Sequence, residues 1–163
     1  MTIALESLPA AAIDRVEPLW RQLLRHHQQV AGHLAELGTV RPSAESWRLR
    51  RAQYRDWLRE PATIVLVAPD GDGIAGYAVG RVVDAPGSWQ WGDRVGVLET
   101  LVVDDRRRGS GVGQALFDRV RAHLAEQGAA VLRISVIAGN DGAARFYRRA
   151  GAVSYTETLI MPI

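Results

Sequence analysis

The segment from Arg106 to Gly113 constrains the fold of this chain more than any other. Three arginines are followed by three glycines at alternate positions, in the order Arg-Arg-Arg-Gly-Ser-Gly-Val-Gly. An apolar run, Leu98 to Val103, precedes the segment, and a helical pattern begins at Gln114. We therefore predict a strand that turns tightly into a helix. Glycines let the backbone turn sharply and approach a ligand, so N–H groups at the helix N-terminus can converge on an anion, above all a phosphate.

Two common phosphate-binding loops are excluded by the residues after the bend. A Walker loop needs Gly-Lys followed by Ser or Thr, whereas Gly113 is followed by Gln114 and Ala115. A dinucleotide-binding loop needs a third glycine three places after the second, and Gln114 stands there. The remaining pattern, Arg108-x-x-Gly111-x-Gly113 after a strand, resembles the pyrophosphate loop of the GNAT superfamily, the acyl-CoA-dependent N-acyltransferases.

A second segment strengthens this resemblance. Residues 140–151 have the sequence Asn-Asp-Gly-Ala-Ala-Arg-Phe-Tyr-Arg-Arg-Ala-Gly. They are similar to the later GNAT motif, in which an Asn precedes a short helix that ends in Phe-Tyr and a glycine. A predicted helix over 110–127 and a predicted strand over 131–137 lie between the two motifs, as they do in the family. The resemblance covers residues 62–157, and the residues before them match only as helices.

The patterns and the resemblance together predict one α/β domain over residues 1–163. It would have a GNAT-like fold, with a mostly antiparallel mixed sheet of about six to seven strands flanked by about four helices. Helical periodicity predicts a long first helix over 9–37, which Pro18 ends or kinks, and a second over 43–59 capped by Ser43. Predicted strands cover residues 2–5, 63–67, 74–83, 94–103, 131–137 and 154–161.

The resemblance implies a binding site for acetyl-CoA as cosubstrate. The backbone of the strand end would pair with the pantetheine arm, and the N–H groups of the loop would hold the pyrophosphate. Arginines at 106, 107, 108, 145, 148 and 149 would supply countercharge. The residues assigned to cosubstrate binding are Leu101, Val102, Val103, Arg108, Gly109, Ser110, Gly111, Val112, Gly113, Asn140 and Tyr147.

Tyr147 and Asn140 each admit a catalytic and a structural interpretation. By resemblance, Tyr147 is the general acid that serves the leaving thiolate, since a phenol with an ordinary pKa is protonated at neutral pH. Its alternative is a core aromatic in the last turn of a helix that Gly151 ends. Asn140 is also among the best residue types for starting a helix, so it could cap that helix while contacting the pantetheine.

The general base is the assignment that the sequence leaves most open. Period-two alternation places Glu99 on the same strand face as Val97, Leu101 and Val103. A carboxylate among such neighbours is costly to bury unless it has a partner or faces a cleft, which makes Glu99 a candidate catalytic base. The alternative is an ion pair with Arg94 or another arginine. His26 and His27, on the first predicted helix, are weaker candidates for the base.

Composition limits the other classes of function. The formal charge is only +2, and the arginines cluster at turns and helix ends, which argues against a nucleic-acid partner. There are no cysteines, and the histidines lack paired ligand spacing, so we expect no metal site. The N-terminal residues lack the apolar core of a signal peptide, so we expect a cytoplasmic protein without membrane contact.

We thus predict an N-acetyltransferase that passes acetyl from acetyl-CoA directly to a primary amine. The alternative is a non-catalytic acyl-CoA-binding or regulatory module on the same fold. Aromatic residues such as Trp89 and Trp91 could line the acceptor side or plug the edge of the core. The sequence leaves open whether the acceptor is a small molecule or a peptide, and whether the terminal strand pairs across a homodimer.

Overall fold

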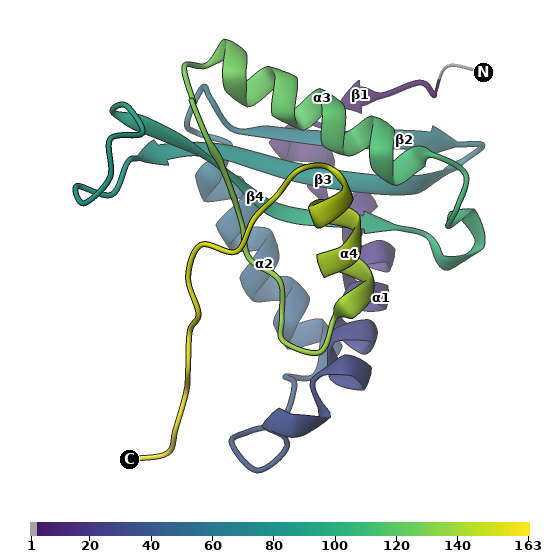
Figure 1. Cartoon of the computed structure of the whole chain (residues 1–163). Helices are drawn as coiled ribbons and strands as arrows, with labels where there is room; N and C mark the ends of the chain where they lie inside the picture. Colours follow the sequence, from purple (N-terminus) through teal and green to yellow (C-terminus); the bar gives the residue numbers. More distant parts are fainter. Residues whose placement is uncertain (1–2) are drawn as a thin grey trace.

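A five-stranded sheet forms the centre of the computed structural model, which describes residues 3–163 (Figure 1). Its strands are β1 (Glu6–Ser7), β2 (Ile64–Asp70), β3 (Gly73–Asp84), β4 (Arg94–Val103) and β5 (Leu132–Ile134). They follow one another in the sheet in chain order. All neighbours are antiparallel except β4 and β5, which run parallel. The mixed, mostly antiparallel sheet is as predicted.

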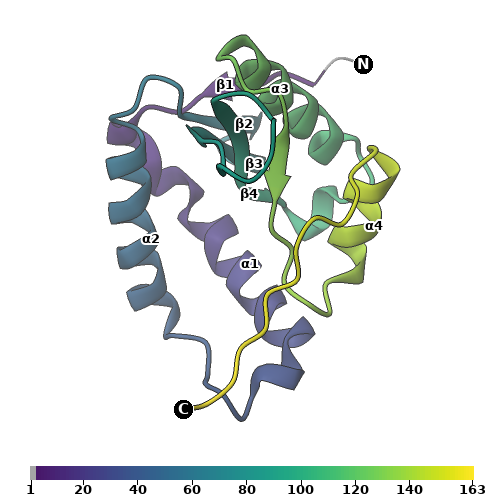
Figure 2. The ribbon, with the colours of Figure 1, turned by 60° about the vertical axis from the view of Figure 1, so that its left-hand side comes forward.

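Helices cover both faces of this sheet. The 3-10 helix η1 (Ala10–Val16), α1 (Glu17–Val30) and α2 (Ser43–Trp57) lie on one side, and α3 (Val112–Glu126) and α4 (Asp141–Arg149) lie on the other (Figure 2). Short 3-10 helices follow α1 (η2, Gly32–Leu34) and β4 (η3, Asp105–Arg107). Each face has its own apolar core, because alternate residues of β2 and β3 point to opposite sides.

Glycines in β3 and β4 bring α3 close to the sheet. A Cβ on Gly80 would lie 2.6 Å from a methyl carbon of Val120, and one on Gly96 would lie 3.1 Å from Leu124. The α3 stripe of Val112, Leu116, Val120 and Leu124 is buried there, as its spacing of four predicts. This packing fixes the N-terminus of α3 at the end of β4, where the phosphate loop was predicted.

The ends of the chain differ most from the predictions. The first edge strand is Glu6–Ser7 rather than residues 2–5, of which Thr2 lies outside the described residues. The first helical region is divided, because Pro18, which lacks an N–H, stands in the first turn of α1. Ser43 begins α2 without capping it, and its hydroxyl instead accepts a hydrogen bond from Arg21. Residues 150–163 form no strand, so the sheet has five strands rather than six or seven.

Candidate functional site

The bend between β4 and α3 is built as an anion site requires. Gly109 and Gly111 have φ angles of +77° and +87°, a region that favours glycine. Gly111 is the residue before α3, and no side chain caps that helix. The first N–H groups of an α-helix have no partners within the helix, so those of α3 are available to an external acceptor. The predicted loop geometry is therefore present.

A cavity of about 460 Å³ brings most of the predicted cosubstrate residues together. Its walls come from the end of β4, the start of α3, the first turn of α4 and the inner face of α1. Gly109, Ser110, Gly111 and Val112 form the bend without lining this cavity. The predicted residues that line it are Leu101, Val102, Val103, Arg108, Gly113, Asn140 and Tyr147.

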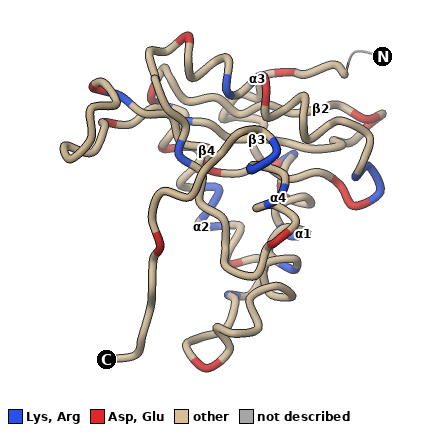
Figure 3. Tube along the Cα trace, in the orientation of Figure 1, with Lys and Arg blue, Asp and Glu red and all other residues tan. Residues whose placement is uncertain are grey.

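The three arginines of the loop are each paired with a carboxylate of the same molecule. Arg106 pairs with Asp104 at 2.7 Å, and Arg108 pairs with Asp105 at 2.8 Å. Arg107 reaches Asp70 at the end of β2. The opposite charges lie together on the loop after β4 (Figure 3). Much of the loop's positive charge is thus balanced internally, so its backbone N–H groups are the main donors left for a phosphate.

Hydrogen bonds from Arg106 hold Asp104 in its ionised form. The backbone N–H and the guanidinium of Arg106 both donate to Asp104 Oδ1, at 2.9 and 3.0 Å. These bonds lower the pKa of the Asp104 carboxyl to about 2. The carboxylate therefore fixes the start of the loop at any pH near neutrality.

Asn140 caps α4 and lies on the cavity wall. Its side-chain oxygen accepts a hydrogen bond of 3.3 Å from the N–H of Ala143, as predicted. His26 Nε2 of α1 lies 3.4 Å from the same oxygen. The residue before Asn140, Gly139, has a φ of +90° and packs against the Val30 carbonyl at the end of α1. Sequence reasoning missed these contacts between α1 and the residues just before α4, because no local pattern links segments so far apart.

Gln22 is a second residue that sequence reasoning missed. Its side-chain amide donates to the Val103 carbonyl at 2.9 Å and accepts from the Asp105 N–H at 3.2 Å. One side chain of α1 therefore satisfies the backbone where β4 ends and the loop begins. A glutamine in a helix carries no sequence signal for this role.

Tyr147 lies in the last turns of α4, between the first cavity and a second one of about 600 Å³. Its ring packs against those of Phe117 and Phe146, with centroid distances of 5.7 and 5.2 Å. Burial raises the pKa of the Tyr147 hydroxyl to about 12. The phenol is therefore protonated at neutral pH and can act as a hydrogen-bond donor.

Glu99 does not share a strand face with Leu101 and Val103, so that part of the prediction was wrong. Val79 and Gly80 of β3 are consecutive, but they pair with Thr100 and Leu98, which leaves Glu99 as the extra residue of a β-bulge. The bulge reverses the alternation, so Leu101 and Val103 face α3 while Glu99 faces α2. There it accepts a hydrogen bond of 3.2 Å from Arg81. The alternative interpretation, an ion pair with an arginine, is thus present in the structure.

The neighbours of Glu99 form a polar cluster on the α2 side. The guanidinium of Arg81 lies 4.4 Å from the ring centroid of Trp57. Thr100 exchanges a 2.7 Å hydrogen bond with the buried Tyr54 hydroxyl. Burial raises the pKa of the Tyr54 hydroxyl. Burial also lowers the pKa of His27, and the charges of the nearby His26 and Arg50 lower it further. His27 is therefore predominantly neutral at pH 7.

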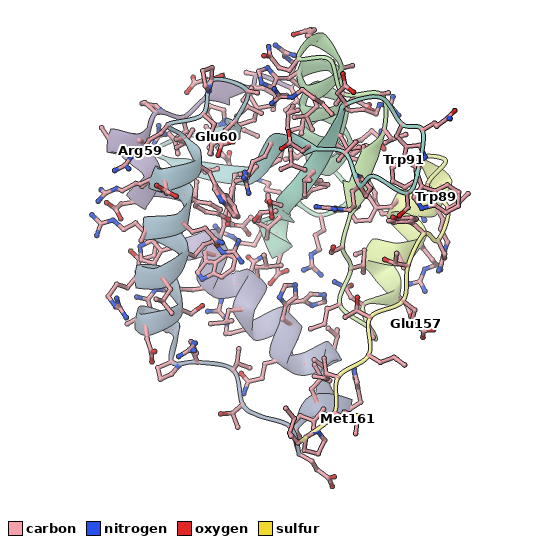
Figure 4. The ribbon with its side chains drawn as sticks, turned by 90° about the vertical axis from the view of Figure 1, so that its left-hand side faces the viewer. Arg59, Glu60, Trp89, Trp91, Glu157 and Met161 are labelled. Atoms are coloured by element: carbon pink, nitrogen blue, oxygen red, sulfur yellow. The ribbon has the colours of Figure 1, made fainter. Side chains whose placement is uncertain are left out.

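The tryptophans of the loop before β4 lie beside the second cavity. Trp89 and Trp91 lie side by side (Figure 4) and stack with ring centroids 5.7 Å apart. The ring centroids of Trp91 and Tyr155 lie 4.8 Å apart. Trp91 and Tyr155 line the cavity together with β5 and α4. Trp47 and Tyr54, in contrast, are buried in the core. His123 Nε2 lies 3.1 Å from the Ala62 carbonyl oxygen.

The helices and the histidine and acidic side chains of residues 3–163 bear on two further classes of site. None of the helices there combines the length and apolar character needed to cross a bilayer. In the same residues, no three His, Asp or Glu side chains gather as they would around a metal ion.

Comparisons with known proteins agree on one family. Residues 20–152 match the model of the Acetyltransferase (GNAT) family. A mycothiol acetyltransferase from Propionibacterium freudenreichii subsp. shermanii is 30% identical over 130 residues, which are 80% of this chain and 38% of that protein. The chain thus matches well under half of that relative's length.

Solved structures share the fold. A tetramutant of the BH1408 protein from Bacillus halodurans superposes with a TM-score of 0.80 and 21% identity, over 99% of this chain and 100% of that one. A GCN5-related N-acetyltransferase from Ralstonia eutropha JMP134 gives a TM-score of 0.71 and 24% identity, over 99% of each chain.

Proposed function

The chain belongs to the GNAT acetyltransferase family, and from this membership we propose that it is an acetyl-CoA-dependent N-acetyltransferase. One observation supports the proposal above all others. The cavity at the end of β4 gathers the strand backbone, the start of α3, Asn140 and Tyr147 around one space. We propose that residues 1–163 act as one domain and that the acceptor is a primary amine of a small molecule or a peptide.

The residues around the cavity fit acetyl-CoA. Uncapped N–H groups at the start of α3 suit a pyrophosphate, and the backbone of Leu101 to Val103 suits an amide-bearing arm. Gly113 lets the start of α3 lie close to the end of β4, because a Cβ there would lie 3.3 Å from a methyl carbon of Val103. When bound, acetyl-CoA supplies a thioester whose C–S bond breaks as the acceptor nitrogen takes the acetyl group.

Tyr147 is assigned to the leaving group. A phenol with a pKa of about 12 is a weaker acid than an ordinary thiol, whose pKa is about 8.5. Complete proton transfer from Tyr147 to a thiolate is therefore unfavourable, and we assign it as a hydrogen-bond donor that stabilises the sulfur charge. Solvent can supply the proton afterwards.

Glu99 is assigned as the base that accepts the amine proton, directly or through water. Its carboxylate lies on the bulge of β4, two residues before the backbone that lines the cavity. The ion pair with Arg81, at 3.2 Å, holds the carboxylate in place on the bulge. His26, on the cavity wall, is the second candidate for this role.

The experiment is a screen of acetyl-CoA-dependent thiol release over classes of amine, paired with calorimetric titration of CoA. We expect CoA to bind and at least one amine class to support turnover. CoA binding without turnover across the whole panel would identify the non-catalytic acyl-CoA-binding module. Absence of CoA binding at millimolar concentration would contradict both interpretations.

A further inference from the structure

Residues 153–163, hereafter the tail, have the pattern of a strand but no strand partner. Apolar side chains recur at alternate positions on both sides of Glu157, which is the one charged side chain of the tail. Most of them are exposed: Val153, Leu159 and Met161 retain 87%, 83% and 81% of their accessible surface. A contiguous group of exposed large apolar residues of this kind indicates an interaction surface.

The same chain carries an open sheet edge. β5 pairs with β4 on one side, and in the described part of the chain no strand pairs with its other side. The backbone N–H and C=O groups of such an edge are a template for an added strand. The second cavity, of about 600 Å³, runs along this edge and is lined by Leu132 to Val136.

The charges of the edge and the tail are complementary. The residues that line the second cavity include Arg133 and Arg148 and no acidic side chain. Within residues 3–163, neither arginine has a carboxylate within ion-pair distance. An extended peptide that carries one negative charge and apolar side chains therefore fits the edge, and Glu157 gives the tail that charge.

The tail does not occupy the edge of its own molecule along its length. Its first residues, Val153 to Thr156, line the second cavity, and Tyr155 packs on Trp91. From Glu157 onward the tail runs away from the sheet (Figures 1 and 4). The exposure of Leu159 and Met161 agrees with this course, since neither is covered by the rest of the molecule.

We propose that residues 157–163 of one copy of this chain add as a strand to the β5 edge of a second copy, and that the exchange is reciprocal. A two-fold dimer satisfies both edges and both tails with a single self-complementary contact. A second copy is the favoured occupant because each chain supplies the open edge and the matching strand at once. The partner tail then forms a wall of the second cavity, which Tyr147 also lines. The dimer does not depend on the transferase activity proposed above.

The first test is the molar mass in solution, measured by size-exclusion chromatography with light scattering. We expect the unmodified chain to be a dimer and the double variant Leu159→Asp/Met161→Asp to be a monomer whose circular dichroism remains that of a folded chain, with a melting temperature lowered by no more than the loss of association explains. Leu49→Asp is the matched control, because Leu49 is an exposed apolar residue of α2, with 42% exposure, away from the tail. It should remain a dimer. A monomeric unmodified chain at all accessible concentrations would overturn the proposal.

The second test locates the contact and exploits the absence of cysteines. A Ser135→Cys chain and a Thr158→Cys chain, distinguished by a mass tag, are mixed and treated with a short bismaleimide. We expect crosslinks between the two chains. The double variant Ser135→Cys/Thr158→Cys should likewise give covalent dimers. Crosslinks confined to single chains would mean that the tail folds back on its own β5 and would overturn the exchange.

A charge variant tests the electrostatic part of the argument. Glu157→Arg places a cation beside Arg133 and Arg148, so it should raise the dimer dissociation constant about fivefold, and less at high salt. An unchanged dissociation constant would show that Glu157 does not lie near these arginines, against the proposed pairing.

Discussion

Arg107 and Asp70 form a bidentate ion pair that connects the loop after β4 to the end of β2. Arg107 Nε and Nη2 donate to the two carboxylate oxygens of Asp70, both at 2.7 Å. Paired hydrogen bonds of this kind fix orientation as well as distance. Arg107 is therefore positioned to hold the loop in shape rather than to meet a phosphate.

The first prediction concerns this pair. Asp70→Asn removes the charge and loosens the loop, so the dissociation constant of CoA should rise about fivefold, while the free energy of unfolding falls by less than about 1 kcal/mol. Calorimetric titration and chemical denaturation measure the two effects. Asp72→Asn, in the same turn, is the control, since Asp72 forms no ion pair within residues 3–163. If Asp70→Asn and Asp72→Asn changed the dissociation constant of CoA equally, Asp70 would have no specific role in holding the loop.

The second prediction concerns Tyr147. Tyr147→Phe removes the hydroxyl and keeps the ring packing against Phe117 and Phe146, so CoA affinity should be retained. Loss of one donor to developing charge should lower kcat by roughly 10²-fold. Steady-state kinetics with calorimetry separate the two quantities. Tyr155→Phe, in the tail, should retain kcat. Full turnover in Tyr147→Phe would exclude Tyr147 from the reaction.

The third prediction distinguishes a base from an ion pair at position 99. If Glu99 takes the amine proton, Glu99→Gln should lower kcat/KM about 10²-fold and remove its rise with pH. Glu60→Gln is the matched control, since Glu60 also contacts Arg81, at 3.7 Å, but is about half exposed. An unaltered pH profile in Glu99→Gln would restrict Glu99 to its ion pair with Arg81.

The fourth prediction compares two glycines on either side of Asn140. A Cβ on Gly139 would overlap the Val30 carbonyl, and its φ of +90° is unfavourable for alanine. Gly139→Ala should therefore lower the free energy of unfolding by roughly 2 kcal/mol or more and weaken CoA binding by displacing Asn140. A Cβ on Gly142 would lie 3.9 Å from Asn140 Oδ1, which is an ordinary contact, so Gly142→Ala should stabilise the protein by about 0.5 kcal/mol. Thermal melts measure both variants.

The predictable part of this molecule is local in sequence. Three features follow from residue types within a few positions of one another. They are the strand over 94–103, the bend at Gly109 and Gly111, and the cap by Asn140. The face that Glu99 was predicted to share with Leu101 and Val103 was wrong, because a bulge depends on how β3 pairs with β4. The Arg107–Asp70 and His26–Asn140 contacts join distant segments, so no spacing could indicate them. The tail has strand periodicity, but a strand also needs a partner edge, which periodicity does not reveal.

The last prediction follows from the lowered pKa of Asp104, about 2 in the folded chain against an ordinary value of 3.8. The unfolded chain binds a proton at Asp104 at a higher pH than the folded chain does, so the stabilisation is present above pH 4 and is lost as the pH falls toward 2. Asp104→Asn should therefore be less stable than the unmodified chain at neutral pH, and the difference should shrink between pH 4 and pH 2. Urea denaturation across that range measures it. Asp105→Asn, which alters only the exposed pair with Arg108, is the control for general acid effects. A difference between Asp104→Asn and the unmodified chain that stays constant down to pH 2 would mean that Arg106 does not hold this carboxylate ionised.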